Sequence, residues 1–157
     1  PGGGQYVEQE GVKPIAIADF QQHFPRIVSD NSGGGIVAWA DERAGAAQSY
    51  IYAQHLNSQG QELWASGGLV MSRSTFRQQN NLRMASNGNN GAWLTWEDGS
   101  TAPKKIYVQY VNEQGELAFN QDVLISNNGV NPQIVADGQN GVWVVWEAAL
   151  TTSKDIF

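Results

Sequence analysis

The chain has 157 residues, and its 41% hydrophobic content can supply the core of one domain, which excludes a wholly disordered chain. Its formal net charge is -6, with only 9 Lys and Arg residues and no basic block, so nucleic acid and anionic membrane surfaces are not expected partners. The absence of cysteine excludes disulfides, thiolate zinc sites and a cysteine nucleophile.

The residue types favour an all-β fold. There are 18 glycines and 6 tryptophans, together with many Asn and Gln residues, a composition typical of short strands joined by tight turns. No apolar run approaches the roughly 20 residues of a membrane-spanning helix, so we expect no membrane insertion. Residues 1–4 (PGGG) lack the basic segment and apolar core of a signal peptide, and we interpret them as an internal cut or linker.

The first predicted element lies in residues 5–18 (QYVEQEGVKPIAIA), which resemble the last strand of the repeat that follows. After it, one hairpin pattern occurs three times. Two apolar stretches flank a turn rich in Gly, Asn and Asp, which tolerate positive φ, so each copy predicts a β-hairpin. The copies are residues 25–41 (PRIVSDNSGGGIVAWAD), 82–98 (LRMASNGNNGAWLTWED) and 132–147 (PQIVADGQNGVWVVWE).

The three hairpins align on two landmarks. One is a glycine late in the turn, at Gly34, Gly91 and Gly141. The other is a tryptophan near the end of the second strand. Trp96 follows Trp39 by 57 residues, and Trp146 follows Trp96 by 50. The chain is therefore a tandem repeat with a period of roughly fifty residues and one longer loop.

A second half follows each of these tryptophans. It begins with an apolar and aromatic strand, at residues 50–54 (YIYAQ), 105–109 (KIYVQ) and 155–157 (DIF). In the first two copies a turn and then a short apolar strand follow, the latter at 69–71 (LVM) and 123–125 (VLI). Each complete repeat therefore predicts four strands, named A to D in chain order, with strand A around Ile27, Met84 and Ile134.

Four antiparallel strands repeated at this period are the sequence form of a β-propeller blade, which packs against its neighbours around a central axis. We predict an all-β β-propeller segment of about three four-stranded antiparallel blades. Its predicted parts are the last strand of a preceding blade (1–19), two blades (20–73 and 74–127) and a partial blade (128–157). We interpret the repeat tryptophans as packing against the next blade, burying on the order of 200 Å² each, rather than as stacking on a ligand.

Propellers have about four to eight blades, so the predicted ring is incomplete. Closing it would need the remaining blades of the same chain or a second copy. We expect an excerpt of a longer protein rather than one protomer of an assembly.

The first copy carries the pattern P-x-I-V-x-D-x-x-G-G-x-x-V-x-W-x-D-x-R followed by I-Y-A-Q. This pattern resembles a repeat of large secreted and cell-surface bacterial proteins, especially those exported with C-terminal sorting domains, as in type 9 secretion. The matching residues are Pro25, Asp30, Gly34, Trp39, Asp41, Arg43, Ile51, Tyr52, Ala53, Gln54, Gly60 and Trp64.

The resemblance covers nearly the whole chain and implies a sialidase-like or lectin-like propeller architecture and a secreted or cell-surface location. It implies no particular activity, because the repeat carries none that is settled. The later copies depart from the pattern after strand B: residues 97–100 (EDGS) lack the Arg, and residues 147–150 (EAAL) lack both the Asp and the Arg.

The sequence favours a role without catalysis. A hydrolytic triad needs a positioned histidine, and His23 and His55 have no acid or serine at a spacing that suggests a partner. We interpret both as surface or hydrogen-bonded histidines. A sialidase-like arginine cluster is incomplete, because the position of Arg26 and Arg83 is occupied in the third copy by Gln133.

No cofactor is expected, with calcium left open as an alternative. Calcium needs about six to eight oxygen ligands, and oxygen-bearing side chains gather in the turns at Asp30, Asn31, Asp137 and Asn140. The same residue types also favour turns by bonding their own backbone, and this turn role is the preferred interpretation.

The candidate ligand-binding residues come just after strand B. They are Asp41, Arg43, Glu97, Asp98 and Glu147, expected in B-to-C loops that gather on one rim of a propeller. For Asp41 and Arg43 the simpler interpretation is a solvated ion pair, because such pairs are common and contribute little.

The function that this sequence favours is a non-catalytic binding or scaffolding module that contacts a glycan or a protein through rim loops. Two alternatives stay open. The chain could belong to a secreted, sialidase-like glycoside hydrolase whose catalytic residues lie outside it, or it could be a passenger or spacer recognised by export machinery.

Overall fold

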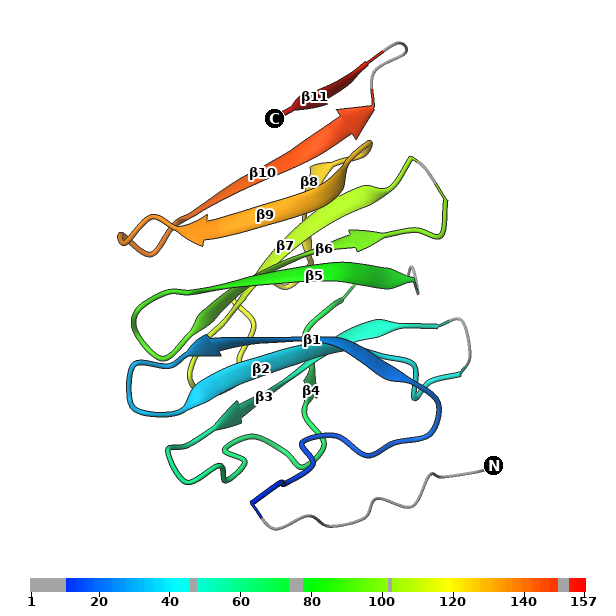
Figure 1. Cartoon of the computed structure of the whole chain (residues 1–157). Coiled ribbons are helices and arrows are strands. Elements are labelled where there is room, and N and C mark those ends of the chain that lie inside the picture. Colours follow the sequence, from blue (N-terminus) through cyan, green and yellow to red (C-terminus); the bar gives the residue numbers. More distant parts are fainter. Residues whose placement is uncertain (1–10, 46–47, 74–77, 102, 150–152) are drawn as a thin grey trace.

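The computed structural model describes residues 11–45, 48–73, 78–101, 103–149 and 153–157. These residues form eleven β-strands and no helix, which confirms the expected all-β fold. The described ranges therefore contain no helix that could cross a membrane. The strands form three antiparallel sheets that lie one above another and do not close into a ring (Figure 1).

Each sheet is a meander in which neighbouring strands follow one another along the chain. The first sheet contains β1 (Gln22–Ser29), β2 (Gly35–Asp41), β3 (Tyr50–Leu56) and β4 (Leu69–Val70). The second contains β5 (Gln79–Ser86), β6 (Ala92–Asp98), β7 (Lys105–Val111) and β8 (Val123–Ser126). The third contains β9 (Val130–Ala136), β10 (Val142–Ala149) and β11 (Lys154–Ile156). The predicted order of strands A to D is confirmed.

The sequence predicts the last strand of a preceding blade in the segment 1–19. Residues 11–21 form no strand, and residues 1–10, which carry the rest of that segment, lie outside the described residues. Ile15 and Ala16 instead line a small cavity of about 150 Å³ together with Val37 and Trp39 of β2. This segment therefore lies against one face of the first sheet.

Successive residues of a strand point to opposite faces of its sheet. We call the face that carries Ile36, Trp93 or Trp143 the front face of its sheet. The opposite face, which carries the repeat tryptophan, is the back face.

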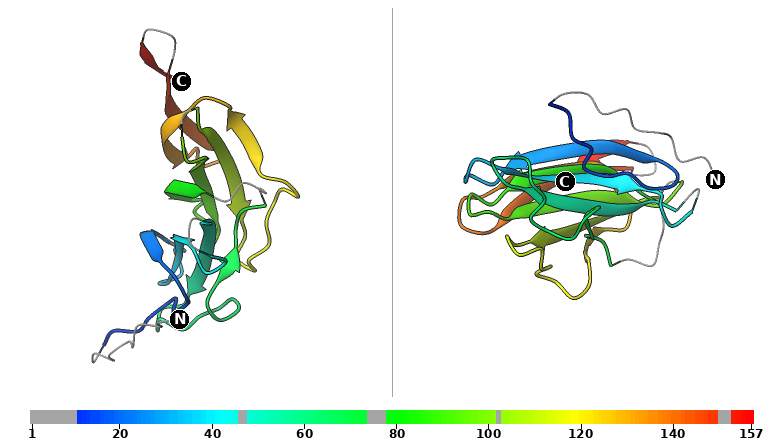
Figure 2. Two further views of the ribbon diagram at one scale, coloured as in Figure 1. Left: turned by 90° about the vertical axis from the view of Figure 1, so that its right-hand side faces the viewer. Right: turned by 90° about the horizontal axis from the view of Figure 1, so that it is seen from below.

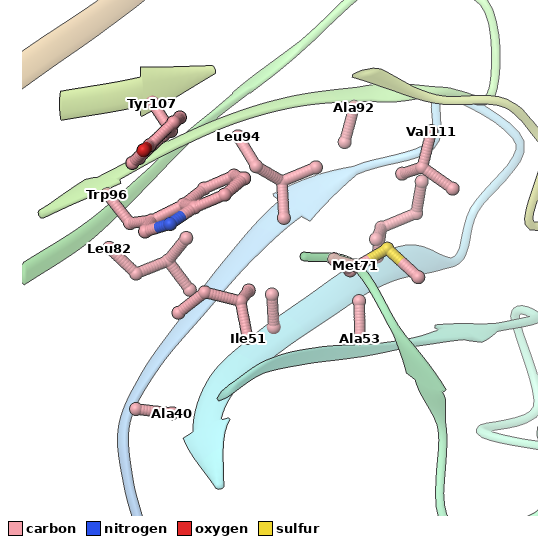
Figure 3. Close-up of a cluster of buried hydrophobic side chains, with 12 residues drawn as sticks. Ala40, Ile51, Ala53, Met71, Leu82, Ala92, Leu94, Trp96, Tyr107 and Val111 are labelled. Carbon is pink, nitrogen blue, oxygen red and sulfur yellow. The ribbon is translucent and has the colours of Figure 1, made fainter. Parts of the chain in front are cut away.

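The main core lies between the front face of the first sheet and the back face of the second (Figure 3). Ile36 and Ile51 of the first sheet and Trp96 of the second are fully buried in it. The third sheet packs against the second through β9, which contacts β5, β6 and β7. Trp93, on the front face of the second sheet, is buried. In side view the first strands, β1, β5 and β9, lie along one side of the stack (Figure 2).

The repeat tryptophans have the same neighbour in every sheet. Each stacks on the aromatic ring that faces it from the third strand. The pairs are Trp39–Tyr52 at 6.3 Å, Trp96–Tyr107 at 6.2 Å and Trp146–Phe157 at 6.3 Å between ring centroids. Trp39 and Trp96 are buried, but the predicted contact with the next blade is wrong. Trp96 packs against the preceding sheet, and Trp39 lies on the back face of the first sheet, where it lines a cavity with Ile15 and Ala16.

A β-bulge lies opposite the repeat tryptophan in each sheet. The pairing of the first strand skips between His23 and Arg26 in β1 and between Asn80 and Arg83 in β5, and a third skip occurs between β9 and β10. The first extra residue of each bulge has a left-handed backbone, with φ of 55° at Phe24, 49° at Asn81 and 55° at Asn131. Bulges of this kind change the direction of a side chain at the sheet edge.

Candidate functional site

A pocket lies at the edge of the stack formed by the first strands. We call it the edge pocket; its volume is about 690 Å³. It is lined by residues of β1, β5, β6 and β9 and by the residue before β7, namely Phe24, Arg26, Asn80, Asn81, Glu97, Lys104, Val130 and Asn131.

The bulges bring three equivalent positions of the repeat into this pocket. Phe24, Asn81 and Asn131 are the left-handed bulge residues of successive sheets, and all three line the pocket. Asparagine tolerates the left-handed region, whereas a bulky aromatic residue there is uncommon. The first sheet therefore contributes an unusual residue at a position that is polar in the other two.

Glu97 joins the second sheet to the third at this pocket. Its side chain is only 3% exposed. Oε1 accepts hydrogen bonds from Nδ2 of Asn81 at 2.6 Å and from the backbone N–H of Asn131 at 2.7 Å. Oε2 accepts a hydrogen bond from Nζ of Lys104 at 2.6 Å. These three donors satisfy both oxygens of the buried carboxylate.

The hydrogen bonds continue along the third sheet. Nδ2 of Asn81 also donates to Oδ1 of Asn131 at 3.1 Å, and Nδ2 of Asn131 donates to Oε1 of Glu147 at 3.0 Å. Nζ of Lys154 donates to Oε2 of Glu147 at 3.3 Å. The bonds from Asn131 and Lys154 hold the pKa of Glu147 below its usual value. We call the connected set Lys104, Glu97, Asn81, Asn131, Glu147 and Lys154 the polar ladder.

The polar ladder does not extend to the first sheet. Ala40 occupies the position of Glu97 and Glu147, and Phe24 occupies the position of Asn81. The first sheet therefore lines the edge pocket with Phe24 and Arg26 and contributes no residue of the polar ladder.

Two arginines lie on the first strands near the pocket. Among the described residues, neither Arg26 nor Arg83 forms an ion pair with a carboxylate. Burial, and next the positive charge of Arg26, lower the pKa of Arg83. Since Arg26 lines the pocket, it offers a guanidinium there.

Asp41 and Arg43 lie outside the lining of the edge pocket, and the interpretation of a solvated pair is wrong for Asp41. Its side chain is fully buried, and Arg43 binds it through Nε at 2.9 Å and Nη2 at 2.6 Å. The indole of Trp39 donates a third bond at 2.7 Å. Arg43 also lies over the ring of Tyr52, 4.0 Å from its centroid. The cluster fixes the end of β2 because each acceptor oxygen of the carboxylate has a charged or polar donor.

The expected loop location is confirmed for Arg43, which lies between β2 and β3, but it is wrong for the other four candidate residues. Asp41 and Asp98 are the last residues of β2 and β6, and Glu97 and Glu147 lie within β6 and β10. The strands continue past the repeat tryptophan by two or three residues. Glu97 lines the edge pocket and Glu147 is connected to it by Asn131, whereas Asp98 is buried and receives a hydrogen bond from Gln79 at 3.4 Å.

Sequence reasoning missed the partner of His55. Nε2 of this buried ring lies 3.0 Å from Oδ2 of Asp30, which is 25 residues earlier in the chain. Oδ1 of Asp30 accepts backbone N–H bonds from Ser32 at 2.7 Å and Gly34 at 2.8 Å. Asp30 thus stabilises its turn.

Asp137 has the same turn bonds, with N–H donors at Gln139 and Gly141. Within the described residues no group of three or more His, Cys, Asp or Glu side chains is arranged to hold a metal ion. The signal that could have indicated the edge pocket is the recurrence of Asn at positions 81 and 131, a residue type that tolerates left-handed backbone.

No family profile, curated protein or solved structure matches the chain. The interpretation of the site therefore depends on its own geometry.

Proposed function

We propose that the chain is a segment of a β-propeller and acts as a non-catalytic binding or scaffolding module of a secreted or cell-surface protein. Two four-stranded sheets and one three-stranded sheet with the same meander order support the assignment of the sheets as blades. The resemblance of the repeat supports the location.

The observation that carries this proposal is the uncovered front face of the third sheet. Ile36 is 0% exposed and lies in the core between the first two sheets. Trp93, at the same repeat position of the second sheet, is 9% exposed and contacts the rings of Tyr110 and Phe119 in its own repeat. Trp143, at the same position of the third sheet, is 70% exposed. The third strands agree, since Ile51 and Ile106 are fully buried and Ile156 is 72% exposed.

An apolar face of this kind is typical of a surface that is covered in the working protein. Since the two equivalent faces are each covered by a sheet of the same repeat, we infer that the third is covered by a further sheet, from the rest of the same chain or from a second copy. The partner of this face is thus a blade, and the edge pocket remains available to a glycan or a protein.

The role of the charged groups supports binding rather than catalysis. Asp41 is enclosed by Arg43 and Trp39, and Glu97 is bonded to Lys104 and to two asparagines. Asp41 thus fixes the end of β2, and Glu97 joins the second sheet to the third. The edge pocket presents mainly amides, a guanidinium and an aromatic ring.

An extended chain tests the blade assignment. Phe157 corresponds to Tyr107 in the repeat, so a copy of residues 108–149 added after Phe157 would complete the third sheet and begin a fourth. We expect Trp143 to become protected from oxidation by N-bromosuccinimide, with the modified residues located by mass spectrometry. The control is the same extension with its residue order scrambled. Equal oxidation of Trp143 in both extended chains would contradict the proposal.

A further inference from the structure

We propose that the edge pocket binds a short neutral oligosaccharide, with the ring of Phe24 packing against a sugar ring and with Asn81, Asn131 and Arg26 bonding its hydroxyl groups. This inference depends on the proposed function as a binding module and names the ligand class of the pocket. The volume of about 690 Å³ lies within the range of about 300–1,000 Å³ that is typical of small-molecule sites.

The aromatic side of the pocket favours a sugar ring. Phe24 is 54% exposed although its backbone is left-handed, with φ of 55°. Such a conformation is strained for a residue other than glycine, so neither burial nor backbone preference accounts for a phenylalanine here. An exposed aromatic ring offers a flat apolar surface, and the C–H groups on one side of a pyranose ring provide the matching surface.

The polar side of the pocket favours hydroxyl groups. Both hydrogen bonds of Asn81 use Nδ2, and among the described residues none donates to its Oδ1. The guanidinium of Arg26 donates one bond from Nη1, to the backbone oxygen of Pro25 at 2.9 Å, and its other donors have no acceptor in the described part of the chain. The pocket therefore presents both acceptors and donors, and hydroxyl groups can bond to each.

The polar ladder holds two of the binding residues, Asn81 and Asn131, in place before a ligand arrives. Asn81 and Asn131 are each bonded to Glu97, which is itself buried and bonded to Lys104. Binding groups that are already fixed lose little conformational entropy on association.

The charges favour a neutral ligand over a polyanion. Lys104 is neutralised by Glu97, which leaves Arg26 as the one lining cation without an acidic partner among the described residues. One guanidinium in a chain of net charge -6 does not attract a polymer of many negative charges. The guanidinium of Arg26 can still donate a hydrogen bond to a hydroxyl or ring oxygen of a neutral sugar.

Titration of the whole chain by NMR tests the inference. The neutral probes are maltotetraose, cellotetraose and chitotetraose, and tetragalacturonate is the acidic probe. We expect at least one neutral tetrasaccharide at millimolar concentration to shift the side-chain amide signals of Asn81 and Asn131, with a smaller effect of the acidic probe.

Two variants locate the binding surface. We expect Phe24→Ala to weaken binding about tenfold or more. Phe20→Ala is a matched control, because Phe20 is 58% exposed with φ of 62° and does not line the pocket. It should bind as the unchanged chain does. Thermal melting identifies a variant that is not folded, and Phe24→Leu, which keeps an apolar side chain without the flat ring, then replaces Phe24→Ala with the same expected loss.

The inference is overturned if no neutral tetrasaccharide shifts these signals, if the acidic probe alone does, or if Phe20→Ala weakens binding as much as Phe24→Ala. Protection of Trp143 in the extended chain together with a negative titration would retain the blade assignment and reject the ligand class. The opposite pair of results would reject the blade assignment alone.

Discussion

The side chain of Glu97 accepts the backbone N–H of Asn131 at 2.7 Å, and through this bond a carboxylate of the second sheet fixes the bulge of the third. The same side chain binds Asn81 and Lys104 within its own sheet. Glu147, one repeat later, has no following bulge to hold within the described residues, and its side chain is 32% exposed. Glu97 and Glu147 occupy equivalent positions of the repeat, but among the described residues only Glu97 bonds the bulge of a following sheet.

We expect Glu97→Ala to lower the free energy of unfolding by about 3 kcal/mol, because it leaves the partly buried ammonium of Lys104, an amide and a backbone N–H without their acceptor. Urea denaturation followed by tryptophan fluorescence measures the change. Glu147→Ala is the matched control and should cost clearly less. Equal losses in the two variants would show that the contact between the sheets does not depend on Glu97.

Trp93 and Trp143 occupy the same repeat position with opposite surroundings. We expect Trp93→Ala to lower the free energy of unfolding by about 3–5 kcal/mol, since it removes a large buried ring from the front face of the second sheet. Trp143→Ala should leave the stability of this chain nearly unchanged because its ring is 70% exposed. Calorimetric melting of both variants checks this, and a large loss in Trp143→Ala would mean that the front face of the third sheet is covered in solution.

Gly68 combines a positive φ of 85° with close packing, because a Cβ atom there would lie 2.7 Å from the ring of Trp39. We expect Gly68→Ala to cost about 3 kcal/mol, from backbone strain and from displacement of that ring. Gly88 has a similar φ of 79° but open space around it, so Gly88→Ala should cost only about 1 kcal/mol. The Cβ atom added at Gly68 would also lie 2.7 Å from the backbone oxygen of Ala53, which cannot turn away as a side chain can. Chemical denaturation measures the difference, and equal losses in the two variants would contradict the prediction.

Acid should weaken the chain through Asp41. Burial would raise the pKa of Asp41, but hydrogen bonds from Arg43 and Trp39 outweigh it and hold the pKa below the ordinary 3.8. The unfolded chain then binds this proton more readily than the folded chain, so the stabilisation is complete above pH 3.8 and is lost as the pH falls below it.

We expect Asp41→Asn to be less stable than the unchanged chain at neutral pH and to lose less additional stability in acid. Arg43→Ala should flatten the acid profile in the same way, because it removes the bonds that lower the pKa of Asp41. Urea midpoints measured across this pH range test both variants. Profiles parallel to that of the unchanged chain would exclude Asp41 as the cause.

The hairpins were predictable from sequence because their signals are local. The turn residues between Asp30 and Gly34 lie a few positions apart, and strand alternation is visible on either side of them. The extent of the second strand was harder to predict, because Asp is a residue type that strands disfavour. The burial of Asp41 is favourable only because the indole of Trp39 and the guanidinium of Arg43 bond its carboxylate, and the residue types alone do not indicate these side-chain conformations.

The edge pocket could be predicted only in small part. Glu97 was a candidate from the repeat pattern, but Phe24, Asn81 and Asn131 were not, because their meeting depends on how one sheet packs on the next. The bulges that direct these side chains into the pocket depend on how two strands pair, and single residues do not indicate them. His55 and Asp30 show the same limit, since their contact joins a turn to a strand 25 residues away.

Because the front face of one sheet packs against the back face of the next, the stack of sheets has a direction. The front face of the third sheet is uncovered at one end, and the back face of the first sheet lies at the other. A contact between two copies that imitated the contact between neighbouring sheets would join unlike surfaces. Repetition of such a contact produces either a closed rotational assembly or an open filament, and a two-fold symmetric pair cannot be built from it. The symmetry of any assembly formed in this way is thus limited by the alternation that buries Trp96 and exposes Trp143.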